Sequence, residues 1–152
     1  MRSEDRLEAL YRAQGPTIWR ALTAFSGDPD LASDALAETF AQALARGDAI
    51  RDASAWVWRT AFRIAAGELK DRRRIPAPVP HEHYELAEPI DHVITALASI
   101  SPNQRLAVVL HDFADRPTDE IAATIGASRA TVHVHLSQGR RRLRKLLEDH
   151  DD

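Results

Sequence analysis

Apolar residues recur at steps of three and four along most of the chain, and this spacing is typical of amphipathic helices. The pattern is interrupted by short polar segments and by one longer stretch rich in proline. The sequence therefore predicts an all-α fold without internal repeats. The segments that carry the helical pattern are 5–26, 30–46, 54–74, 92–113 and 117–147.

Polar and proline residues indicate where these helices begin, break and end. Asp30 is expected to open the second helix and Ser54 to cap the third, because both side chains accept hydrogen bonds from free backbone N–H groups. Gly15-Pro16 is expected to interrupt the first helix, since proline lacks an amide donor. Ser101-Pro102 divides 92–113 into two helices. The second of them, with Leu106, Val109, Leu110 and Phe113, is expected to pack under the helices of 117–147.

The segment 75–91 separates two helical regions. It holds four of the eight prolines and no Lys or Arg, so it is expected to be an acidic, Pro-rich linker. The predicted architecture is two small helical domains, residues 1–74 and 92–152, joined by this flexible linker at 75–91.

Residues 117–147 predict two helices with a tight turn between them. Thr118 is a candidate N-cap for the first helix, Gly126 ends it, and Ser128 caps the second. The second helix carries an apolar stripe that includes Gly139, where the missing side chain indicates close packing. The stripe consists of Val132, Leu136, Gly139, Leu143 and Leu146.

The opposite face of that second helix has the character of a base-reading surface. Its residues are mostly small or able to form hydrogen bonds, which suits a helix in the DNA major groove. Six Lys and Arg residues and no acid lie between Arg129 and Lys145, and they suit phosphate contacts. The alternative is a solvated amphipathic helix with a basic end. The residues of this face are Ala130, His133, Val134, Ser137, Gln138 and Arg141.

Two features of the first region bear on function. Trp56 and Trp58 are two positions apart on a helix, so they cannot both face a core; Trp56 is the one placed among the core candidates. Aromatic rings beside arginines also stack on unpaired bases. On the helix before, Asp34 and Glu38 form an acidic ridge that is either a solvated surface or a docking face beside Phe40.

Composition narrows the function classes. The chain has 152 residues, 44% of them hydrophobic, no cysteine and a net charge of −3, with its positive charge concentrated in two short blocks. Neither a membrane span nor a signal peptide is recognisable, so a cytoplasmic protein is expected. His81 and His83 lie in the predicted linker with only Glu as a further metal ligand nearby, and no phosphate loop or nucleophile arrangement appears, so no metal site, cofactor or enzymatic activity is predicted.

The ordered combination of these motifs resembles a bacterial extracytoplasmic-function (ECF) sigma factor of the sigma-70 superfamily. The string EIAATIGASRATV with its basic helix resembles the C-terminal domain of that family, DPDLASDALAETF its polymerase-docking helix, and SAWVWRTAFRIA the helix beside the −10 element. The resemblance implies binding to core RNA polymerase, through the clamp helices of the largest subunit and the flap of the second-largest, and to promoter DNA. It also makes an anti-sigma partner plausible.

Carried over position by position, the resemblance implies three sets of site residues, with His135 near the DNA backbone. The −35 set is Arg129, Thr131, His133, Val134, Ser137, Gln138 and Arg141; the −10 set is Arg46, Asp48, Arg51, Trp56, Arg59 and Arg63; the polymerase-docking set is Asp34, Glu38 and Phe40.

Two alternatives stay open. One is a stand-alone helix-turn-helix regulator, whose dimer would bind an inverted repeat without polymerase. The other is a sigma-like inhibitor or adaptor that binds polymerase without opening promoters. Departures from the family pattern at Ala37, Arg63 and Gly67 motivate the second alternative.

Overall fold

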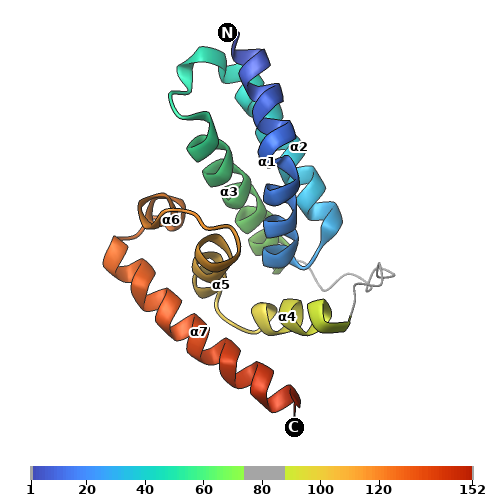
Figure 1. The fold of residues 1–152 in the computed structure, drawn as a ribbon, viewed down its shortest axis with the longest axis vertical. Coiled ribbons are helices and arrows are strands. Elements are labelled where there is room, and N and C mark those ends of the chain that lie inside the picture. The colour runs from blue at the N-terminus through green and yellow to red at the C-terminus, as the bar shows by residue number, and fades with distance from the viewer. Residues whose placement is uncertain (1, 74–87, 152) are drawn as a thin grey trace.

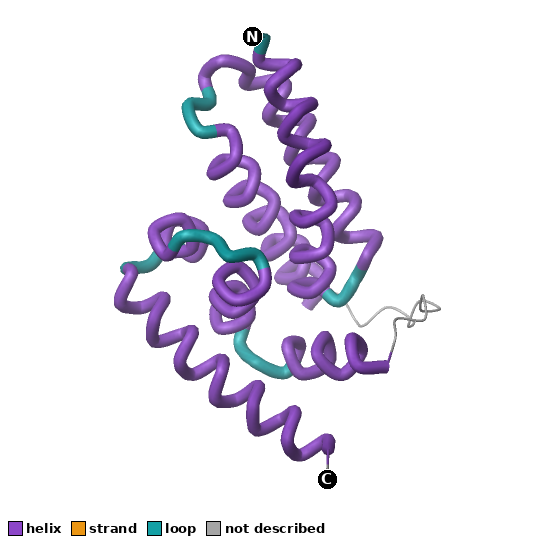
Figure 2. The backbone as a smooth tube through the Cα atoms, in the orientation of Figure 1, coloured by secondary structure: helices purple, strands orange, loops and turns teal. Residues whose placement is uncertain are grey.

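A computed structural model describes residues 2–73 and 88–151, and within these ranges all regular structure is helical (Figure 2). Two helical regions lie on either side of the undescribed stretch, as the sequence predicts. Most of the predicted linker lies outside the described residues, together with Arg74, His81 and His83.

The N-terminal region is a bundle of three helices, drawn from blue to green in Figure 1. They are α1 (Ser3–Ser26), α2 (Pro29–Arg46) and α3 (Ala53–Arg73), with a 3-10 turn η1 (Gly47–Ala49) before α3. The predicted interruption at Gly15-Pro16 is wrong, because α1 runs through it. Leu7 and Ile18 are buried on either side of Pro16, and we attribute the unbroken helix to this packing, which offsets a proline cost of about 3 kcal/mol.

At two helix starts, the residue that caps the helix lies two positions before the predicted one. Asp28, not Asp30, caps α2, because its carboxylate accepts from the backbone N–H groups of Asp30 and Leu31 at 2.9 and 3.1 Å. Asp52 accepts from the N–H of Ala55 at the start of α3. Ser54 instead donates its hydroxyl to the side chain of Gln14 on α1.

The C-terminal region holds α4 (Glu88–Ala98), α5 (Pro102–Val108), a π-helical turn η2 (Val109–Phe113), α6 (Thr118–Ile125) and α7 (Arg129–Asp151). The predicted break between α4 and α5 is confirmed. Ser101 and Gln104 form a reciprocal capping box there, in which each side chain accepts from the other residue's backbone N–H. Helix α4 begins four residues before the predicted boundary at 92.

The helix-turn-helix of α6 and α7 has the predicted turn. Gly126 has φ +78°, and the Ser128 hydroxyl accepts from the N–H of Thr131 at 3.1 Å. Thr118 is the first residue of α6 and forms no cap; Pro117 precedes it. Phe113 was expected under this unit, but its side chain is 56% exposed. One extra residue per turn in the π-helix rotates the last positions of η2 relative to an α-helical pattern, which explains the difference.

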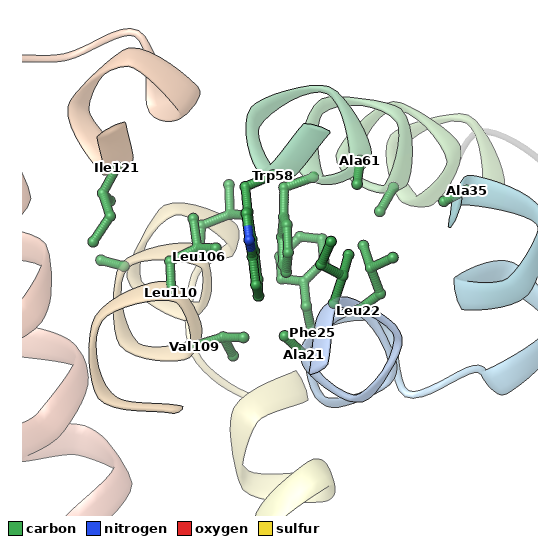
Figure 3. Close-up of a cluster of buried hydrophobic side chains, with 14 of the residues drawn as sticks. Ala21, Leu22, Phe25, Ala35, Trp58, Ala61, Leu106, Val109, Leu110 and Ile121 are labelled. Carbon is green, nitrogen blue, oxygen red and sulfur yellow. The ribbon is translucent and has the colours of Figure 1, made fainter. Parts of the chain in front are cut away.

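The two regions share one hydrophobic core, shown in Figure 3. Phe25 of α1 and Trp58 of α3 lie in the same cluster as Leu106, Leu110 and Ile121 of the C-terminal region. Trp58 is only 2% exposed and stacks with Phe62 at 6.1 Å between ring centroids. The core position therefore belongs to Trp58, whereas Trp56, which the sequence placed there, is half-buried.

Three arginines make polar contacts between the regions. Arg63 of α3 donates to the carbonyl of Ala123 on α6 at 2.7 Å. The guanidinium of Arg116 lies 4.8 Å from the centroid of the Trp58 ring. Arg105 is buried and donates to the carbonyl of Phe25, at the end of α1, to two carbonyls at the end of α4, and to the carbonyl of Ile100 just after it. Helix C-termini carry partial negative charge, which suits this cation.

Candidate nucleic-acid interface

One face of α7 presents the predicted base-reading residues to solvent. Thr131, His133, Ser137, Gln138 and Arg141 are exposed, and Val134 is 51% exposed although it is apolar. His135 is half-buried at the edge of this face. Val132 and Leu136 on the opposite side are buried, so the register of the helix is fixed by its core. The structure thus brings the predicted −35 residues together on one exposed face.

The position of α7 is fixed by close packing on α5 and by an ion pair with η2. A Cβ added at Gly139 would lie 3.0 Å from Cγ2 of Val108 and 3.3 Å from Cβ of Gln104. The predicted close approach at this glycine is confirmed. At the next position along α7, Arg140 donates from Nε to the carboxylate of Asp112 at 2.9 Å.

This ion pair changes the electrostatics of the basic end of α7. The hydrogen bond from Arg140 holds the pKa of the Asp112 carboxyl below its ordinary value, and burial only partly opposes the shift. Arg140 is therefore engaged within the protein. The basic residues left exposed for a phosphate backbone are Arg141, Arg142, Arg144 and Lys145.

At the N-terminus of α7, Arg129 pairs with Asp119 of α6 at 3.2 Å. Both side chains are well exposed, so exchanging this partner for a DNA phosphate costs little.

A second candidate surface lies where η1 and the following loop meet α3. Four of the six predicted −10 residues line one pocket there: Arg46, Arg51, Trp56 and Arg59. The guanidinium of Arg46 lies 5.6 Å from the centroid of the Trp56 ring. The arrangement places an aromatic face among three cations, which suits a stacked, negatively charged nucleotide.

The structure separates the other two predicted −10 residues from this pocket. Asp48 does not line it, and its carboxylate pairs with Arg6 of α1 at 3.1 Å. Arg63 is further along α3 and is engaged with the carbonyl of Ala123. In this closed arrangement, Arg63 lies at the contact between the two regions.

The predicted docking residues of α2 divide between surface and core. Asp34 and Glu38 are exposed one turn apart, and Glu38 accepts from the side-chain amide of Gln42 at 3.0 Å. Phe40 is only 8% exposed and packs edge-on against Tyr11 at 5.1 Å, so its side chain does not lie on the acidic face.

The sequence did not single out three side chains that hold these surfaces in place. Arg105 and Arg116 join the two regions, and Gln104 donates its side-chain amide to Gln138 of the exposed face. The capping-box pattern of Ser101 and Gln104 is the one local signal that pointed to any of them.

Among the residues that the structure describes, no group of three or more His, Cys, Asp or Glu side chains is placed to hold a metal ion. In the same ranges, no helix is both long enough and apolar enough to cross a membrane.

Comparison with known proteins agrees with this geometry. Residues 91–143 match the family model described as Sigma-70, region 4. The ECF RNA polymerase sigma factor SigE of Mycolicibacterium smegmatis is 28% identical over 159 residues, a match that covers 94% of this chain and 62% of SigE. The ECF RNA polymerase sigma factor SigL of Mycobacterium tuberculosis is 25% identical over 158 residues, a match that covers 94% of this chain and 89% of SigL. The chain thus spans less than two thirds of SigE and most of SigL.

A solved structure has the same fold. The sigma factor RpoE of Bartonella quintana, in complex with the anti-sigma factor NepR, matches with a TM-score of 0.77 at 23% identity. The match covers 95% of this chain and 98% of RpoE.

Residues 91–143, which contain the helix-turn-helix of α6 and α7, are thus similar to region 4 of the sigma-70 type, and a three-helix bundle precedes them in the chain. Over 94% of its length, the chain is similar to ECF RNA polymerase sigma factors.

Proposed function

We propose that this protein binds core RNA polymerase and directs transcription initiation at promoters with −35 and −10 elements. The observation that carries the proposal is the exposed face of α7, which is small, hydrogen-bonding and held in a fixed register by Val132, Leu136 and the contact at Gly139. A helix of this kind is what the major groove of a duplex accepts.

In this proposal the C-terminal region binds the −35 duplex. Val134 contacts a thymine methyl group, and Ser137 and Gln138 form hydrogen bonds with base edges. Arg129 and Arg141 bind phosphates, which adds affinity without sequence information. The side chains that support this division are exposed and lie on one face of α7.

The N-terminal region acts on the −10 element. An unpaired base stacks on the Trp56 ring, and Arg46, Arg51 and Arg59 bind the adjoining backbone. Support comes from the pocket that these four residues line. Stacking of this kind stabilises an opened strand, because every base has an aromatic face to offer.

Asp34 and Glu38 dock on polymerase, where an exposed acidic ridge meets a basic partner surface. Phe40 supports the ridge from the core rather than touching the partner, since it is buried. By analogy with RpoE, which was solved with NepR, an anti-sigma factor is a further candidate partner. Because its main partner is RNA polymerase, the protein acts in the cytoplasm.

In the closed arrangement Arg63 is exposed but its guanidinium is engaged with Ala123, so opening of the two regions frees it to bind DNA. Arg63 donates to Ala123 of α6, and Trp58 is covered by Arg116. Opening exposes this part of α3 and frees the C-terminal region to bind at a distance from the −10 element.

Run-off transcription with purified core polymerase and genomic fragments tests the proposal, with and without the protein. New discrete starts that share a −35/−10 pair are expected, and they are expected to weaken when Asp34 and Glu38 are both changed to Ala. A matched control is Asp30→Ala on the same helix, which lies exposed in the first turn. Polymerase binding without new starts would favour an inhibitor or adaptor. An inverted-repeat footprint without polymerase would favour a stand-alone regulator.

A further inference from the structure

The side chain of Gln104, in the first turn of α5, lies between a helix cap and the base-reading face of α7. Its Oε1 accepts from the backbone N–H of Ser101 at 3.3 Å, and its Nε2 donates to Oε1 of Gln138 at 3.3 Å. Its backbone N–H in turn donates to the hydroxyl of Ser101 at 3.2 Å. Gln104 is therefore held from three sides.

The orientation of the Gln104 amide follows from its partners. A backbone N–H is only a donor, so the group that faces Ser101 has to be the carbonyl oxygen of the Gln104 amide. The opposite end, which faces Gln138, is then the NH₂ group. Because that group only donates, Gln138 turns its own oxygen toward it.

Close packing holds the two glutamines beside each other. Gly139 follows Gln138, and a Cβ added there would lie 3.3 Å from Cβ of Gln104 and 3.4 Å from its backbone oxygen. The backbones of α5 and α7 thus approach each other at this point, and a larger residue would separate the pair.

We propose that Gln104 is a positioning residue that sets which base the recognition helix accepts opposite Gln138; the inference rests on the proposed function. Gln104 engages one of the two lone pairs of the Gln138 oxygen and turns that oxygen toward α5, so Gln138 presents mainly its N–H donors to DNA. The bidentate contact that glutamine makes with adenine needs both the oxygen and the NH₂ group, so it is weakened.

N–H donors select bases that present acceptors. Guanine offers N7 and O6 in the major groove and thymine offers O4; adenine offers N7 beside its N6 donor, whereas cytosine offers only the N4 donor. Gln138 in this orientation is therefore expected to favour guanine, then thymine, at its promoter position and to disfavour cytosine.

The variant Gln104→Glu changes the orientation of the Gln138 amide while it keeps the capping box at the start of α5. Glutamate also accepts from the N–H of Ser101, and it is the other common residue at this position of a capping box. It has no donor, so Gln138 is expected to rotate, donate to the introduced carboxylate and turn its oxygen to the DNA. Preference should then move to cytosine and adenine, which present N–H donors, by about tenfold relative to guanine.

Run-off transcription from a promoter pool randomised across the −35 element measures this preference. Gln104→Ala is the matched control, because it frees the Gln138 amide to turn either way. It should raise the preference for adenine without raising the preference for cytosine to the same degree. In a Gln138→Ala background, Gln104→Glu should change no base preference. Circular dichroism checks that each variant is folded.

The outcomes are distinguishable. If the variants transcribe with the wild-type base preference, or if Gln104→Glu shifts preference equally in the Gln138→Ala background, the positioning role is overturned and the proposed function stands. If the wild-type protein gives no starts from any member of the pool, the proposed function itself fails.

Discussion

The contact between α5 and α7 at Gly139 makes a quantitative prediction about stability. Gly139→Ala gains about 1 kcal/mol of helix propensity. The added Cβ would lie 3.0 Å from Val108, which is buried, and 3.4 Å from the backbone oxygen of Gln104, which cannot rotate away. Overpacking a tight contact costs about 1–3 kcal/mol. The overlap is with a core side chain and a fixed backbone, so the cost lies in the upper half of this range, and we expect a net loss of about 1–2 kcal/mol.

Gly67→Ala is the matched control. Gly67 is exposed within α3, and a Cβ added there meets nothing within 4 Å. This substitution should therefore keep most of the helix-propensity gain, about 0.5–1 kcal/mol. The two substitutions are chemically identical and should change the free energy of unfolding in opposite directions.

Equilibrium unfolding in urea, followed by far-UV circular dichroism, measures both variants. The midpoint should fall for Gly139→Ala and rise for Gly67→Ala, with little change in the slope against denaturant. If Gly139→Ala were stabilised as much as Gly67→Ala, the close approach of α5 and α7 would be refuted. The basis for holding Gln104 beside Gln138 would be lost with it.

Three further predictions concern ion pairs and the pocket. Arg140 depresses the pKa of Asp112 in the folded state, so this carboxylate stabilises the fold above its unfolded pKa of about 3.9, and the benefit is lost as pH falls through the folded value. Wild type should therefore be more stable than Asp112→Asn at pH 7, by at most about 1 kcal/mol because the pair is partly exposed, and this difference should disappear as the pH falls below 4. A difference that persists at pH 2 would contradict this. Arg105→Met leaves several buried carbonyls without this donor and should cost roughly 3 kcal/mol in thermal or urea unfolding, whereas a loss within 0.5 kcal/mol would argue against the buried contacts. Trp56→Ala should reduce run-off transcription from duplex promoters more than from templates already unpaired at −10, while Trp56→Phe keeps an aromatic ring and should retain more activity; equal losses on both templates would refute a stacking role in strand opening.

The helix-turn-helix was predictable because its signals are local. Gly126 needs a positive φ, Ser128 sits where a cap is required, and the stripe of Val132 and Leu136 fixes the buried side of α7. The start of α2 was predictable in principle as well. Asp28 followed by Pro29 is the usual order of cap and first helical residue, and it is a stronger signal than Asp30.

The buried positions within a helix were harder to assign. Hydrophobic periodicity shows which face of a helix is apolar, but not which other elements pack against that face. Trp56 and Trp58 both fit a helical pattern, and the neighbours that Trp58 meets in the fold, among them Phe62 and Arg116, decide that it is the buried one. The sequence assigns Phe40 to the docking surface of its helix, but its side chain is buried against Tyr11 of α1. The π-helical turn η2 leaves Phe113 exposed, and no residue pattern in 109–113 signalled it.

The contact between the two regions had no signal in the sequence, and it has an energetic consequence for the proposed function. The bond from Arg63 to Ala123 is exposed, and the guanidinium of Arg116 over Trp58 is also paired with Glu120, so each contact contributes at most about 1 kcal/mol. A partner that binds only the opened protein has its apparent affinity lowered by the free energy of closure. Two such contacts correspond to a reduction of roughly tenfold, at about 1.4 kcal/mol per factor of ten, and the shared hydrophobic core adds to it. Arg63, which the sequence assigns to an exposed DNA-binding surface, therefore also helps to set how readily that surface becomes available.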